Sequence, residues 1–204
     1  MSDANHEHPP LPFWQKYIFS TDHKVIGIQY GLTALLFLFF GFCLIMLMRW
    51  QLAYPEVPLP LLKHLFSENH PNLPGGVMDP AFYNQLGAMH GTIMIFLGVV
   101  PLVVGAFGNF VVPLQVGAPD MAFPKLNMAS YWLYFIGGVI MLVSFFLPGG
   151  AANSGWTSYA PLSIIATMGQ TCWLIGMAFL IQSSLLGSIN IIVTTFQLRA
   201  KGFT

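Results

Sequence analysis

The chain has 204 residues, of which 55% are hydrophobic and only 7% are charged, and its formal net charge is zero. A soluble domain carries about a quarter charged residues, so this composition excludes most soluble classes and indicates a membrane protein. No basic region suggests a nucleic-acid partner. Cys43 and Cys172 lie inside apolar runs, which favours two small buried hydrophobic residues over a disulfide.

Residues 1–24 are polar and form the predicted N-terminal segment, in which we expect no cleaved signal peptide. His6 and His8 are more consistent with a solvated tail than with a metal site, because no further ligand is near them in the sequence. Trp14 and Tyr17 are residue types that favour the membrane–water interface.

Four apolar segments follow, at residues 25–48, 89–113, 131–147 and 172–196. Crossing a bilayer takes about 20 residues, which the third segment only just provides. A segment in lipid must satisfy its own backbone, so we predict an all-α integral membrane domain of four transmembrane helices over residues 25–204. A soluble helical core is the alternative, and four long uncharged runs disfavour it.

The basic residues predict the orientation of these helices. Arg49 and Lys63 lie on one side, and the remaining five lie on the side that holds both ends of the chain: Lys16, Lys24, Lys125, Arg199 and Lys201. The positive-inside rule then puts both ends in the cytoplasm or mitochondrial matrix. The long proline-rich loop after the first span contains His64 and His70, for which surface histidines are favoured over a copper or zinc site.

His90 is the one histidine inside a predicted span, at the head of the second apolar run and toward the outer side. Ionisable residues within a membrane are functional candidates. An imidazole here could share a heme iron with a histidine from elsewhere, or could make a structural hydrogen bond, and the residues alone favour neither. Arg49 ends the first span, where it could extend to lipid headgroups or hold the polar edge of a cofactor.

Asp120 lies on the predicted inner side, in a turn between Pro119 and Pro124. It is compatible with a turn residue and with a carboxylate that collects protons. Polar residues recur near it and along one face of the fourth span: Asn109, Asn127, Ser183, Gly187, Asn190 and Thr194. Such a stripe can join helices or order a file of water. Three glycines of the second span, Gly98, Gly105 and Gly108, would allow close approach of a helix or a flat ring.

Several stretches resemble subunit I of the heme–copper terminal oxidases, most closely the cytochrome c oxidase branch. They are STDHKVIG at 20–27, YNQ at 83–85, MHGTIMIF at 89–96, GNFVVPLQVGAPDMAFPKLN at 108–127, SYWLY at 130–134, GWTSYAPLS at 155–163 and SSLLGSIN at 183–190. The resemblance implies the first third of a bundle of about a dozen spans. It also implies a bacterial plasma membrane location, with the mitochondrial inner membrane less favoured.

The resemblance gives expected roles to individual residues. His90 matches an axial ligand of the low-spin heme, heme a or alternatively heme b, and Arg49 matches the arginine near its formyl group. Asp120 matches the entry carboxylate of a proton-uptake path. Asn109 and Asn127 match residues at the mouth of this path, and its water chain is matched by Ser183, Ser184 and Asn190. The family reduces dioxygen to water with electrons from cytochrome c and pumps protons.

Two positions depart from the family pattern. Met128 follows Asn127 where the family commonly has a second asparagine, and Gln51 replaces a glutamate of an outer calcium or sodium site, which we therefore do not expect. The ligands of copper, of the second heme and of the other face of the low-spin heme have no match. We expect no oxygen-reduction site in this chain alone.

A companion chain, or the rest of a divided subunit, is thus an expected partner, together with other oxidase subunits, cytochrome c and the lipid bilayer. A quinol-fed oxidase of the same superfamily is one alternative. A non-catalytic membrane scaffold or assembly fragment is another, which the presence of both His90 and Asp120 disfavours. The Asp120 pattern also disfavours a nitric oxide reductase.

Overall fold

A computed structural model describes residues 12–60 and 72–202 of the chain. Within them, four helical spans are long and apolar enough to cross a membrane: His23–Ala53, Pro80–Val116, Pro124–Phe146 and Met168–Gln197. The predicted all-α membrane fold is therefore confirmed, and no regular strand occurs in these two ranges. The candidate residues His6, His8, Lys63, His64 and His70 lie outside the described residues.

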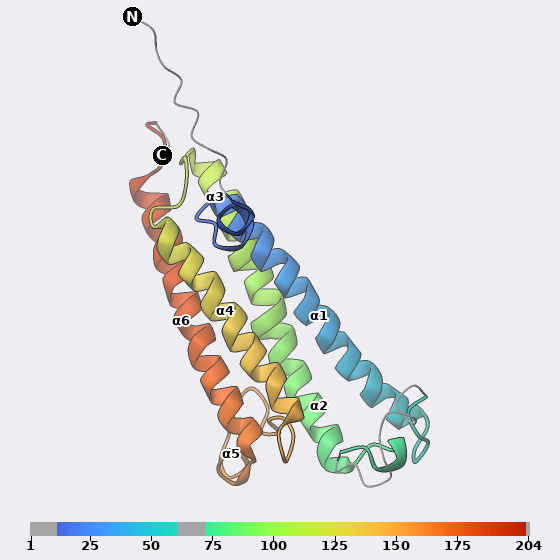
Figure 1. The fold of residues 1–204 in the computed structure, drawn as a ribbon. Helices are drawn as coiled ribbons and strands as arrows, with labels where there is room; N and C mark the ends of the chain where they lie inside the picture. Colours follow the sequence, from blue (N-terminus) through green and yellow to red (C-terminus); the bar gives the residue numbers. More distant parts are fainter. Residues whose placement is uncertain (1–11, 61–71, 203–204) are drawn as a thin grey trace, which may run out of the picture.

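The spans form two packed pairs (Figure 1). α1 (His23–Ala53) packs against the second span, which consists of α2 (Pro80–Thr92), η3 (Ile93–Val99), η4 (Pro101–Gly108) and α3 (Asn109–Val116). α4 (Pro124–Val143), extended by η5 (Ser144–Phe146), packs along α6 (Met168–Gln197). The short elements are η1 (Trp14–Ile18), η2 (Pro74–Gly76) and α5 (Leu162–Ile165).

The second span begins nine residues earlier than the predicted boundary at Met89, so His90 lies inside the helix rather than at its head. Asp79 caps this helix, since its Oδ2 accepts a hydrogen bond from the Ala81 amide at 2.8 Å, and Pro80 takes the first helical position. The prediction was wrong here because Asn84, Gln85 and Gly87 of the first turns interrupt the apolar pattern before Met89.

Gln85 explains why polar residues occur in these turns. Its Nε2 donates to the Gly149 carbonyl at 2.8 Å, and its Oε1 accepts from the Ala151 amide at 3.1 Å. Gln85 is buried, so this pair of bonds fixes the loop after α4 against the second span.

The middle of the second span is π-helical on both sides of Pro101. Proline has no amide hydrogen and its ring collides with the preceding turn, so a widened helix accommodates it where a regular α-helix would be interrupted. The span ends at Gly117, whose φ of 72° is a left-handed conformation that glycine adopts without a steric cost.

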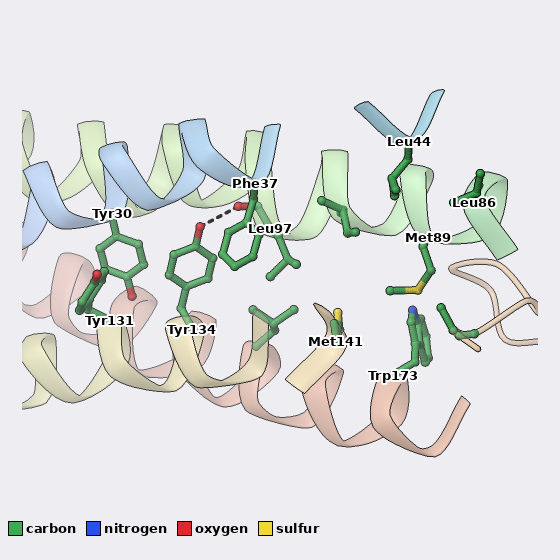
Figure 2. Packing of buried hydrophobic residues seen from close by; sticks show 14 of the residues in the cluster. Tyr30, Phe37, Leu44, Leu86, Met89, Leu97, Tyr131, Tyr134, Met141 and Trp173 are labelled. Carbon is green, nitrogen blue, oxygen red and sulfur yellow. Dashed lines mark hydrogen bonds between the residues drawn. The ribbon is translucent and has the colours of Figure 1, made fainter. Parts of the chain in front are cut away.

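Buried aromatic rings join the two helix pairs (Figure 2). The Tyr30 ring of α1 lies 5.2 Å from the rings of both Tyr131 and Tyr134 of α4. The Tyr134 hydroxyl donates to the Leu97 carbonyl of η3 at 2.7 Å. Three elements therefore meet at one aromatic cluster in the middle of the bundle.

Glycines set the distances between neighbouring helices. A Cβ on Gly105 would lie 2.5 Å from the Tyr30 ring, and a Cβ on Gly98 would lie 2.4 Å from Leu38, so α1 occupies the space that these glycines leave. Gly137 of α4 and Gly176 of α6 have the same relation, because a Cβ on either would lie 2.8 Å from the carbonyl oxygen of the other. Close packing of α4 on α6 thus requires both glycines.

The structure corrects the expectation for the cysteines in part. Cys43 and Cys172 are free, as predicted, but both are half-buried instead of buried.

Replacement of Gly137 by alanine should separate α4 from α6. We expect a destabilisation of roughly 1–3 kcal/mol, typical of an overpacked contact, which would appear as a lower thermal unfolding midpoint of the assembled protein in detergent. Gly187→Ala is the matched control, because nothing lies within 4 Å of a Cβ at that position in the same bundle. Equal midpoints for the two variants would show that the close crossing does not contribute to stability.

Candidate functional site

His90 makes a hydrogen bond that decides which of its ring nitrogens is free. Its Nδ1 lies 2.8 Å from the Gly41 carbonyl oxygen of α1. A carbonyl oxygen only accepts, so Nδ1 carries the hydrogen in this contact, and Nε2 is the nitrogen left for another partner. Backbone carbonyls orient metal-binding histidines in this manner. The ring is half-buried and is therefore fixed in direction without being enclosed.

The packing on the two sides of His90 differs. A Cβ on Gly91 would have no atom within 4 Å, whereas a Cβ on Gly41 would lie 2.7 Å from the Met94 sulfur. The helix contact is therefore tight at Gly41 and open at Gly91. Among the described residues, no group of three or more histidine, cysteine, aspartate or glutamate side chains could hold a metal ion. A single histidine of this kind could supply one ligand to a heme iron.

Arg49 lies in the same half of the bundle as His90. It is eight residues beyond Gly41 on α1, which corresponds to about 12 Å along a helix axis. Its side chain is exposed. The helix continues to Ala53, so Arg49 is in its last turns and does not end it as predicted.

Asp120 lies at the other end of the second span, half-buried in the loop before α4. Its Oδ1 accepts a hydrogen bond from the Met121 amide at 2.6 Å, as a turn aspartate would. The same geometry leaves part of the carboxylate accessible, so this contact is compatible with both predicted roles.

Two polar residues of α6 hold the loop that follows Asp120. The Asn190 amide pairs with the backbone of Phe123, accepting from its N–H at 2.9 Å and donating to its carbonyl at 3.2 Å. The Thr194 hydroxyl accepts from the Ala122 amide at 2.9 Å and donates to the Asn190 carbonyl at 2.7 Å. The predicted polar stripe is thus buried against a loop backbone at this end.

Asn109 and Asn127 are buried with unsatisfied amide atoms. Asn109 is 2% exposed and Asn127 is fully buried. The Asn109 Nδ2 donates to the Gly105 carbonyl at 2.6 Å, but its Oδ1 and both amide atoms of Asn127 have no hydrogen-bond partner. Buried polar groups nearly always have a partner, which is often an ordered water.

A cavity of about 240 Å³ lies between the second span and α6. It brings together three predicted residues, Asn109, Ser183 and Ser184, while Asp120, Asn127 and Asn190 are not in its lining. Ser183 also joins α6 to α4, because its hydroxyl donates to the Ser130 carbonyl at 2.6 Å. Tyr30 lines the cavity as well, and its hydroxyl lies 3.1 Å from that of Ser183.

Sequence analysis did not single out His23, which the structure buries. It is the first residue of α1 and 3% exposed, and its Nδ1 lies 2.8 Å from the Asn109 carbonyl. The sequence places it in the polar segment 1–24, yet Asp22 is an N-cap, since its Oδ1 accepts from the Lys24 amide at 2.7 Å. An aspartate directly before an apolar run is the signal that could have placed the helix start.

Comparison with known proteins gives consistent matches over nearly all of the chain. The model of the family "Cytochrome C and Quinol oxidase polypeptide I" matches residues 25–204. Cytochrome c oxidase subunit 1 of Thermostichus vulcanus is 43% identical over 195 residues, which cover 95% of this chain and 32% of the relative. The same subunit of Synechocystis sp. is 42% identical over 200 residues, which cover 97% of this chain and 32% of the relative.

A third relative, the alternative cytochrome c oxidase subunit 1 of Bradyrhizobium diazoefficiens, is 38% identical over 203 residues, covering 96% of this chain and 31% of its own length. The chain therefore spans about a third of the length of the curated relatives it matches.

The role of Thr194 in holding the loop after Asp120 can be tested by comparison with the adjacent Thr195. Thr194→Val removes the acceptor of the Ala122 amide, and one lost hydrogen bond of about 0.5–1.5 kcal/mol should speed hydrogen exchange in the segment 121–123 by roughly 2- to 12-fold. Thr195→Val is the control, because that hydroxyl donates only within its own helix, to the Ile191 carbonyl. If both variants exchange at the wild-type rate, the Thr194 contact does not hold the loop.

Proposed function

Because the chain belongs to the cytochrome c and quinol oxidase polypeptide I family, we propose that it supplies one axial ligand of the low-spin heme and the proton-uptake entrance of a terminal oxidase. Its four spans and its bacterial relatives identify a multi-pass bacterial membrane protein. We propose that both ends of the four-span bundle face the cytoplasm, with Asp120 on that side and His90 toward the outer side.

The observation that carries the heme assignment is the bond from His90 to the Gly41 carbonyl. The bond uses Nδ1, so Nε2 would be the nitrogen that holds the iron, and a Cβ at the neighbouring Gly91 would meet no atom within 4 Å. Heme iron, when bound, transfers one electron at a time. Arg49 would place a positive charge near the polar edge of the ring, and the second axial ligand would come from outside this chain.

The buried amides carry the proton assignment. Asp120 would take protons from water at the inner end of the bundle. Asn127 and the Asn109 Oδ1 would hold water, because the protein gives these buried atoms no partner. Ser183 and Ser184 would continue the path along the cavity wall, where each hydroxyl can donate and accept. Asn190 would fix the loop at the entrance through its pair of hydrogen bonds to the backbone of Phe123.

We assign the electron donor to cytochrome c, because the relatives carry that name. The family description also includes quinol oxidases, which makes a quinol-fed enzyme the second candidate. Copper, the second heme and the reduction of dioxygen would belong to the rest of the subunit or to companion chains.

Substitution of His90 by alanine should remove the low-spin heme absorption band of the assembled oxidase, because no other histidine of α2 could replace the ligand. His23→Gln is the control, since His23 also bonds a backbone carbonyl through Nδ1 but lies at the opposite end of the bundle. Co-purification of the partner chains would verify assembly. A low-spin band that persists in His90→Ala would exclude His90 as the ligand.

Asp120→Asn should slow proton uptake and oxygen reduction by roughly tenfold or more, since a positioned proton-transfer group contributes at least that factor. Heme content and spectra should stay unchanged. Asp79→Asn serves as the control at the outer end, because asparagine caps a helix as well as aspartate does. Wild-type turnover of Asp120→Asn would remove this carboxylate from the path.

A further inference from the structure

The residues from Phe13 to Phe19 form an exposed aromatic patch next to a cation. Phe13, Trp14 and Tyr17 are 62%, 64% and 45% exposed. The Phe13 ring lies 5.9 Å from that of Trp14 and 5.3 Å from that of Tyr17, so the three rings form one surface. The ammonium of Lys16 lies 5.1 Å from the centre of the Tyr17 ring. We call residues Phe13–Phe19 the aromatic turn.

The aromatic turn is held in place by two other helices. Gln29 of α1 donates through Nε2 to the carbonyls of Tyr17 at 2.6 Å and Ile18 at 2.9 Å. The Phe19 ring stacks on Trp132 of α4 with centres 5.2 Å apart and an angle of 27° between the planes. Contacts to both α1 and α4 fix the orientation of the exposed rings relative to the bundle.

The position of the turn matches the boundary of the membrane. It lies at the end of the bundle where α1 begins and α6 ends (Figure 1). Below it, α1 exposes a run of large apolar side chains, which are 53–69% exposed: Ile28, Leu32, Leu35 and Leu36. The aromatic turn therefore lies at the end of a span that exposes large apolar side chains.

The charges at this end favour one kind of lipid. Lys16, Lys24, Lys125 and Arg199 are all exposed there. Among the described residues, the two aspartates at this end are engaged in local contacts, Asp22 as the cap of α1 and Asp120 with the Met121 amide. Basic residues beside interfacial aromatic rings bind anionic headgroups.

We propose that the aromatic turn is a docking surface for anionic phospholipid. Phe13, Trp14 and Tyr17 lie at the boundary between headgroups and acyl chains, and Lys16 pairs with the headgroup phosphate. Gln29 and Trp132 keep the turn in the plane of the membrane surface. The first span is thereby fixed at a defined depth, independently of any heme or proton chemistry.

The test measures contact between Trp14 and lipid in the assembled complex, reconstituted in phosphatidylcholine nanodiscs. A small, fixed fraction of the lipid is replaced by brominated phosphatidylglycerol or by brominated phosphatidylcholine, and bromine quenches the tryptophan fluorescence on contact. The difference between the wild type and Trp14→Phe isolates the contribution of Trp14. The control is Trp156, whose contribution is isolated in the same manner. Trp156 is 62% exposed and lies in the loop between α4 and α6, at the opposite end of the bundle. No residue from 126 to 198 is charged.

Phosphatidylglycerol should quench Trp14 about fivefold more effectively than phosphatidylcholine, as expected for one basic residue near a membrane surface. Lys16→Gln should reduce this preference, and Trp156 should respond equally to both lipids. Absence of quenching by either lipid would overturn the proposal, because Trp14 would then face water or another protein. Equal quenching of Trp14 by the two lipids, or a preference unchanged in Lys16→Gln, would overturn the recognition of anionic headgroups.

Discussion

A polar group in hydrocarbon needs a partner inside the protein, and this constraint organises the bundle. The backbone meets it by forming helices. Polar side chains meet it by bonding to the backbone of a neighbouring helix, as His90 does with Gly41, Tyr134 with Leu97 and Ser183 with Ser130. Each of these bonds both holds two helices together and orients the side chain that makes it. The His90 bond joins α1 to the second span and also orients the imidazole ring.

Some exceptions to this constraint lie at the end of the bundle that holds Asp120. Asn109 Oδ1 and both amide atoms of Asn127 are buried without a partner, as are atoms elsewhere in the bundle such as the indole nitrogens of Trp50 and Trp132. At the same end, the side chains of Asn190 and Thr194 form hydrogen bonds with the backbone of the loop after Asp120. A rigid loop and unsatisfied amides together suit a water-filled entrance, because the walls stay fixed while the water exchanges.

Much of this architecture could be predicted from sequence, because four uncharged apolar runs specify four spans and one intramembrane histidine stands out at His90. Helix ends were less predictable, since Gln85 and His23 are polar and only their distant partners bury them. The stripe of Ser183, Gly187, Asn190 and Thr194 was visible in the sequence as one face of a helix. Whether that face meets water or backbone depends on where Phe123 lies, which local sequence does not contain.

In the proposed function, the Gly41 carbonyl would hold the His90 ring so that Nε2 could bind heme iron. This role of the Gly41 carbonyl is tested most directly in His90→Gly, where the space of the side chain is left for an added ligand. Imidazole, which can both donate to Gly41 and bind iron, should restore the low-spin band at a lower concentration than 1-methylimidazole, which has no N–H. Equal restoration by the two compounds would contradict the account, because the donated hydrogen bond would then have no part in holding the ligand.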